Sequence, residues 1–212
     1  EITLYAQWSI NSYTVIFNSD GTAVTAITQE YNTEVAKPAD PEKRGYTLAG
    51  WLNGDTEVSF PLILTDNLSL TAKWTPVNYA ITYKNVDDIN NNNPASYTIE
   101  SDPIELGVPG PKLGYTFEGW YTDEAFSETS RVSGVAIASG STGARIFYAK
   151  WKANQYGINF DDGTESNNAG GSMSAQTFTY DVEQPLSSNE FSNPGYRFIG
   201  WGTAPNSEGI YK

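Results

Sequence analysis

The stretch GYTLAGW, Gly45–Trp51, decides the fold of this chain, because it returns as GYTFEGW at 114–120 and as GYRFIGW at 195–201. The sequences on either side of each copy recur as well. Recurrence of this kind is typical of tandem modules, which provide length or multivalency more often than a single active site. We therefore expect an array of small repeated units.

A second repeated pattern ends in tryptophan. It reads ITLYAQW at 2–8, LSLTAKW at 68–74 and RIFYAKW at 145–151. The residues alternate with period two, so Leu70, Ala72 and Trp74 share one face while Lys73 lies on the other. This alternation predicts a closing strand in each unit, with one face buried.

A third pattern, tyrosine-x-hydrophobic-x-aromatic, begins five residues after each of these tryptophans, at 13–17, 79–83 and 156–160. A polar turn and a second strand follow it, which together predict a hairpin. The four residues between tryptophan and tyrosine span at most about 13 to 14 Å. We therefore expect neighbouring units to have little freedom to reorient, as in a semi-rigid rod.

Proline-containing segments at 37–44, 108–113 and 186–194 precede the three glycine-tyrosine motifs. Proline lacks a ladder donor, so these segments are expected to be irregular or short helical crossovers. Within the motif, Tyr46 and Leu48 have one parity and Trp51 has the other. All three can face the core only if the strand is bulged near Gly50.

These patterns predict a mainly β fold, α+β at most. The predicted organisation is residues 1–8 as the closing strand of a preceding repeat, 9–74 as module 1, 75–151 as module 2, and 152–212 as module 3, truncated before its closing strand. Because the chain begins at Glu1 inside a repeat, we expect it to be an internal fragment of a longer polypeptide.

Composition narrows the function classes. The chain has 12 basic and 25 acidic residues, a net charge of −13, and no cysteine or histidine. The acidic balance disfavours nucleic acid as a partner. Without cysteine, stability must come from aromatic packing and strand pairing. No apolar run is long enough for a membrane span in this fragment.

The succession Y-x-V-x-F-N, K-P-x-x-P-x-x-x-G-Y-T-x-x-G-W and L-x-L-T-A-K-W within residues 13–74 resembles the Listeria-Bacteroides repeat, which is related to the B-repeats of internalin-type proteins. The resemblance covers essentially the whole chain. It implies a β-grasp-like module in elongated tandem arrays on secreted or cell-wall-attached bacterial proteins. The family supplies no catalytic residues, so none is transferred.

Candidate sites are few. Trp51, Trp120 and Trp201 are expected to fill the module cores, although a sugar-stacking platform is the alternative. Tyr121 or Phe126, which do not recur, are better candidates for ligand contact. We assign no catalytic, cofactor or metal residues, and the ligand-binding residues stay unknown.

Two loops offer clustered oxygen atoms of the kind that Ca²⁺ prefers. They contain Asp87, Asp88 and 90–93 in one case, and Asp161, Asp162 and Glu165 in the other. Asn- and Asp-rich turns also form for backbone reasons alone, which we favour here. Catalysis is disfavoured, because general acid-base chemistry would rest on carboxylates in unequal loops.

The sequence thus predicts a non-catalytic stalk or spacer on the bacterial cell surface or in a secreted protein. The alternative is an adhesive module that binds a host or matrix protein or glycan through the variable loops 85–96 and 121–144. Neighbouring repeats are the expected partners. Residues 2–8 of one molecule are also expected to complete module 3 of another, head to tail.

Overall fold

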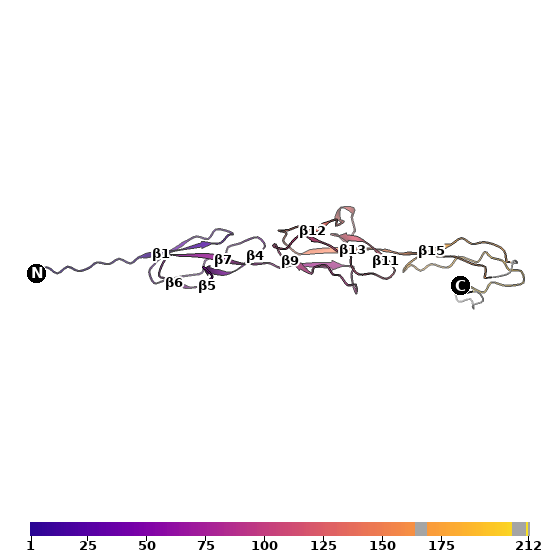
Figure 1. Ribbon diagram of the computed structural model, residues 1–212, viewed down its shortest axis with the longest axis horizontal. Helices are drawn as coiled ribbons and strands as arrows, with labels where there is room; N and C mark the ends of the chain where they lie inside the picture. The colour runs from indigo at the N-terminus through magenta and orange to yellow at the C-terminus, as the bar shows by residue number, and fades with distance from the viewer. Residues whose placement is uncertain (164–168, 205–210, 212) are drawn as a thin grey trace. The chain divides into compact units, whose positions relative to one another are not determined.

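The computed structural model of the protein describes residues 1–163, 169–204 and 211 (Figure 1). The chain packs as two compact units. Unit 1 contains residues 1–83, 93–106 and 132–147, and unit 2 contains residues 84–92, 107–131 and 148–212.

Unit 1 is built on a five-stranded sheet in the order β2-β1-β7-β4-β5. The strands are β1 (Ser12–Asn18), β2 (Ile27–Glu30), β4 (Tyr46–Asn53), β5 (Thr56–Val58) and β7 (Leu68–Pro76). Strands β1 and β7 are parallel, whereas the other pairs are antiparallel. The first strand and the closing strand of module 1 therefore lie side by side at the centre of the sheet.

The core of unit 1 lies between this sheet and a two-stranded pair, β3 (Thr33–Val35) with β6 (Leu62–Leu64). Val15, Leu70 and Trp51 are 0 to 1% exposed, and the Phe17 and Trp51 rings meet edge to face at 4.9 Å. Leu70 is buried and Lys73 is exposed, which confirms the alternation predicted for the closing strand.

The predicted bulge is present. Leu48 pairs with Trp74 and Gly50 with Lys73, so the register of β4 against β7 shifts between Leu48 and Gly50. In unit 2, β11 (Tyr115–Tyr121) shifts against β13 (Arg145–Ala153) between Phe117 and Gly119. The shift turns the motif tryptophan inward, and the side chains of Trp51 and Trp120 are both buried.

Unit 1 also contains β9 (Ser96–Tyr97), β10 (Ile104–Glu105), β12 (Val135–Ile137) and all of β8 (Tyr79–Lys84) except Lys84. Unit 2 contains β11, η1 (Glu128–Ser130), β14 (Gln155–Ile158), β15 (Gln176–Thr179) and residues 148–153 of β13. The hairpins β1–β2, β8–β9 and β14–β15 are antiparallel, as predicted.

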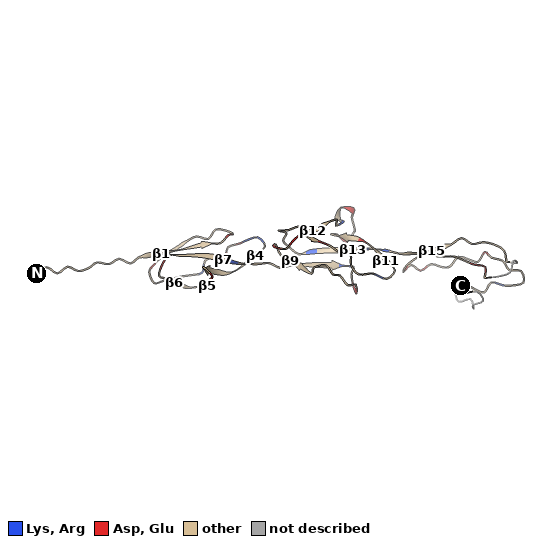
Figure 2. Ribbon diagram, viewed as in Figure 1, with Lys and Arg blue, Asp and Glu red and all other residues tan. Residues whose placement is uncertain are grey.

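The proline segments are irregular rather than helical, and the described residues contain a single 3-10 turn and no α-helix. The fold is therefore mainly β. A five-stranded sheet with a central parallel pair and an irregular crossover is the β-grasp-like module expected from the resemblance. Aspartate and glutamate lie largely in loops and turns of each unit (Figure 2).

Candidate functional site

In unit 1, the first glycine of the module 1 motif contacts residues of module 2. Gly45 is buried, has φ +79°, and its carbonyl oxygen accepts a hydrogen bond from the N–H of Val77 at 2.9 Å. A Cβ atom at this position would lie 2.6 Å from Cδ1 of Ile99. Both the left-handed backbone and the close approach therefore require glycine.

The same contact recurs in unit 2, between modules 2 and 3. Gly114 has φ +76°, and its carbonyl oxygen accepts a hydrogen bond from the N–H of Asn154 at 2.8 Å. An added Cβ atom would lie 2.3 Å from the ring of Tyr180. In modules 1 and 2, the motif is thus also the surface that contacts the segment that follows the closing strand.

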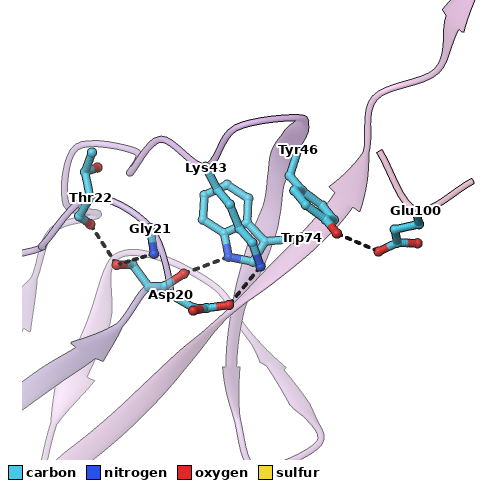
Figure 3. Close-up of polar contacts among 8 residues, drawn as sticks. Asp20, Gly21, Thr22, Lys43, Tyr46, Trp74 and Glu100 are labelled. Atoms are coloured by element: carbon cyan, nitrogen blue, oxygen red, sulfur yellow. Dashed lines mark hydrogen bonds and ion pairs between the residues drawn. The ribbon is translucent and has the colours of Figure 1, made fainter. Parts of the chain in front are cut away.

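The motif tyrosines complete this contact through a hydrogen bond to an acidic residue, an arrangement that we call the clasp. Tyr46 Oη donates to Glu100 Oε1 at 2.8 Å (Figure 3), and Tyr115 Oη donates to Asp181 Oδ2 at 2.9 Å. Each hydrogen bond to the carboxylate, with some burial, raises the pKa of its tyrosine. The Tyr115 ring also meets the Tyr180 ring edge to face at 5.4 Å.

A lysine lies beside each clasp tyrosine. Lys43 Nζ is 4.5 Å from the centre of the Tyr46 ring and 5.9 Å from that of Trp74, and it bonds Asp20 Oδ2 at 2.8 Å (Figure 3). The hydrogen bond to Lys43 lowers the pKa of Asp20, and the same bond raises the pKa of Lys43. Lys43 therefore links Asp20, in the first turn of module 1, to Tyr46 of the glycine-tyrosine motif of the same module.

Lys112 occupies the matching place in unit 2. Its Nζ is 4.6 Å from the centre of the Tyr115 ring and 5.7 Å from that of Trp151. Lys112 differs from Lys43 in one respect, because it makes no ion pair within the described ranges.

The tryptophan of each closing strand makes a hydrogen bond to the end of the first strand of its own module. Trp74 Nε1 donates to the carbonyl oxygen of Ser19 at 2.7 Å, and Trp151 Nε1 donates to that of Asn85 at 2.9 Å. Ser19 and Asn85 are therefore equivalent positions at the end of the first strand of their modules. The closing strand is tied to the hairpin before the chain enters the next module.

The connections between modules are short as well as bonded. Only residues 77 and 78 separate β7 from β8, and only Asn154 separates β13 from β14. A glycine contact, a tyrosine clasp and a link of one or two residues leave few free backbone torsions at each junction. Each junction thus combines a short link with bonded contacts between the motif and the hairpin that follows.

The sequence profile of the Listeria-Bacteroides repeat domain matches the chain three times, at residues 13–73, 79–150 and 156–212. The chain belongs to the Listeria-Bacteroides repeat family. Each matched segment starts at the tyrosine of a first strand, and the first two end at the closing strand.

Relatives of this repeat chain are larger proteins. A protein named putative membrane protein from Evansella cellulosilytica is 30% identical over 98% of the chain, which covers 31% of that relative. A putative Gly-rich membrane protein from the same organism is 32% identical over 94% of the chain and 22% of its own length. The chain thus spans less than a third of either relative.

Internalin H of Listeria monocytogenes is 45% identical over 56 residues, which is 26% of this chain and 10% of that protein. No solved structure matches the chain. Within its described part, no helix has the length and apolar character needed to cross a membrane.

Several predicted site residues belong to the cores of the repeats. Trp51 is 1% exposed and Trp120 is 3% exposed, so neither ring offers a face to a sugar. Trp201 is half-buried and packs against Phe160 at 4.6 Å between ring centres. Core packing, expected for all three, is thus observed for Trp51 and Trp120, whereas Trp201 is only half-buried.

The two non-repeated aromatic residues differ. Tyr121 is 2% exposed, which excludes its ring as a ligand platform. It packs edge to face against Phe126 at 5.4 Å, with Lys150 Nζ 5.3 Å from its ring centre. Phe126 is half-buried with φ +55° and lines a surface groove, so it stays available for contact.

In the described part of the Asn- and Asp-rich loops, no group of three or more aspartate and glutamate side chains is placed so that it could hold a metal ion. The structure explains one of these turns through the backbone, since Asp88 has φ +58°. Glu165 lies outside the described residues.

The clasp was missed from the sequence, although a signal was present. A lysine stands two residues before the glycine in two of the three motifs, as Lys43 and Lys112. An acidic residue follows the second hairpin strand at Glu100 and Asp181. Period-two reasoning treats both as solvated positions, and only the contact across a junction reveals their role.

Proposed function

We propose that this chain is a non-catalytic, semi-rigid spacer in a bacterial cell-surface or secreted protein. The observation that carries the proposal is the repetition of the clasp. The two junctions have different sequences but the same arrangement. In each, a tyrosine hydroxyl donates to a carboxylate, at Tyr46–Glu100 and at Tyr115–Asp181, and a glycine is in close contact with the following module beside a short link. A segment whose function is spacing needs such repeated control of orientation, whereas a flexible tether does not.

The biological setting is supported by the relatives. Two are named putative membrane proteins and one is named an internalin, and each is much longer than this chain. A repeated β module that forms a minor part of a long envelope-associated protein suits the projection of other domains away from a surface.

Small-angle X-ray scattering tests the spacer role. The expected result is an extended particle whose maximum dimension changes little between low and high salt, because the clasp is short-ranged. The double variant Tyr46→Phe with Tyr115→Phe removes both hydroxyl donors and keeps the rings, and it should broaden the distance distribution. A compact particle in the native chain would refute the proposal.

An adhesive role is the second candidate. The observation in its favour is a groove of unit 2 to which both variable loops contribute, through Asn85, Asp87 and Phe126. Replacement of 86–95 and 122–130 by Gly-Ser sequences of equal length should abolish binding to any host or matrix molecule identified in a screen. Binding retained after both replacements would place the contacts elsewhere.

Head-to-tail association through residues 2–8 is a further part of the proposal. Leu4 and Trp8 are 90% and 92% exposed, whereas Leu70, the counterpart of Leu4 in module 1, is fully buried and belongs to β7, the strand between β1 and β4. We propose that residues 2–8, which form no strand in the single chain, pair as a strand at the matching place in module 3 of a second copy. Light scattering should show association that is lost on removal of residues 1–8, and unchanged association would contradict this proposal.

A further inference from the structure

Unit 2 contains a surface groove of about 360 Å³ beside its clasp. Three half-buried aromatic side chains, Tyr115, Phe126 and Trp151, form part of its wall. The polar side chains that line it are Lys112, Asn85 and Asp87. Clefts with apolar and aromatic walls and a few polar groups are the usual form of small-ligand sites.

The cation of this groove lacks the acidic partner that its counterpart has. In unit 1, Asp20 directly follows Ser19, whose carbonyl oxygen receives the tryptophan hydrogen bond, and Asp20 neutralises Lys43 at 2.8 Å. In unit 2 the residue that follows the equivalent Asn85 is Val86. Lys112 therefore keeps its place over two rings without a carboxylate bound to it in the described part of the chain.

The replacement of the acidic residue by Val86 leaves the Lys112 ammonium group able to bind an anion. An ammonium group held against ring faces has little conformational freedom left to lose when it meets an anion. A charge-assisted hydrogen bond from such a group to a carboxylate is stronger than a neutral one. The aromatic walls offer apolar contact to the C–H face of a ring. Asp87 supplies a carboxylate acceptor for hydroxyls, and the side-chain oxygen of Asn85 supplies another, while Asn85 Nδ2 donates to the carbonyl oxygen of Ala149 at 3.2 Å.

We propose that this groove binds a pyranose sugar that carries a carboxylate, with the carboxylate on Lys112 and the sugar ring against the aromatic wall. A neutral sugar could pack against the aromatic side chains but would offer no anion to the Lys112 ammonium group. Asp87 is the acidic residue that lines the groove, so the carboxylate must lie on the lysine side. The proposal is independent of the spacer role and names a ligand class for the groove that the adhesive candidate uses.

The test is a titration of the ¹⁵N-labelled chain followed by NMR. The probes are 3′-sialyllactose, a glucuronate-containing hyaluronan tetrasaccharide, and lactose as the neutral counterpart. The indole N–H signal of Trp151, assigned through Trp151→Phe, should shift with an acidic probe, while that of Trp74 stays in place. Response to only one acidic probe identifies the source of the carboxylate and still supports the site.

Matched variants decide whether the lysine acts as inferred. Lys112→Gln should weaken binding of the acidic probe about tenfold or more, the size expected for one charge-assisted hydrogen bond. Lys43→Gln, the same change at the paired lysine, should leave it unchanged. Val86→Asp restores an acidic partner at the place of Asp20 and should weaken binding as much as Lys112→Gln, whereas Val86→Asn should not.

Each alternative outcome is informative. Equal affinity for lactose and sialyllactose, equal effects of the two glutamine variants, or no shift with either acidic probe at about 10 mM would overturn the proposal. Circular dichroism and thermal melting of each variant show whether a loss of binding comes from unfolding. Because scattering measures the spacer role separately, failure of one proposal leaves the other standing.

Discussion

At the scale of single residues, equivalent side chains in two repeats have different partners. Trp120 Nε1 donates to the carbonyl oxygen of Gly107 at 2.8 Å. Trp51 Nε1 is buried and has no hydrogen-bond partner among the described residues. A buried donor without a partner costs about 1 to 3 kcal/mol of desolvation. The two repeats therefore share the buried tryptophan ring but not the hydrogen bond of its indole N–H.

This difference predicts unequal effects of one substitution. Both Trp51→Phe and Trp120→Phe remove similar volume from a core, but only Trp120→Phe removes an indole hydrogen bond to a carbonyl oxygen. We expect Trp120→Phe to reduce the free energy of unfolding by ~1 kcal/mol more than Trp51→Phe does. Urea denaturation followed by circular dichroism measures both, and an equal or reversed order would contradict this assignment.

Tyr83 gives the chain a pH dependence in alkaline solution. Burial raises the pKa of Tyr83 to about 12 from 10.0. Because the folded pKa is raised, the stability that this tyrosine contributes is fully present below pH 10 and is lost as the pH rises toward 12. Thermal melting temperatures should fall over this range, and they should fall less in Tyr83→Phe. Parallel profiles for the two proteins would exclude this residue as the cause.

At the scale of elements, alternation and repetition predicted most of the fold. The hairpins, the closing strands and the bulge near Gly50 followed from side-chain parity, because one buried face leaves a sheet little choice of register. Parity could not predict the parallel pairing of β1 with β7, which depends on where the crossover places distant segments. It could not predict the clasp either, because its residues lie 54 and 66 positions apart.

The close contact between Gly114 and the Tyr180 ring gives a prediction at the scale of elements. Gly114→Ala combines a left-handed backbone, which costs a non-glycine residue about 1 to 2 kcal/mol, with a clash against the Tyr180 ring. Gly54→Ala at a loop glycine with φ +60° has the backbone cost and open space around the added methyl group. Gly114→Ala should therefore lower the unfolding free energy more than Gly54→Ala. Equal losses would show that the β14–β15 hairpin moves away at little cost.

At the scale of the whole molecule, repeats that touch through a few bonded junctions unfold according to the strength of those junctions. The native chain is expected to lose neighbouring modules together, because each clasp adds contacts that only a folded neighbour can make. The double variant Tyr46→Phe with Tyr115→Phe weakens both junctions while the module cores stay intact. Its urea transition should broaden or divide into steps, and an unchanged single transition would show that the short links alone couple the modules.

The parallel pairing of β1 with β7 has a mechanical consequence. The chain enters module 1 through β1 and leaves it through β7, and four residue pairs join these two strands along their length. Tension applied to the chain pulls the two strands past one another, so their hydrogen bonds are loaded together in shear instead of opening one after another. A module connected in this way resists extension most strongly along the line that joins the start of β1 to the end of β7.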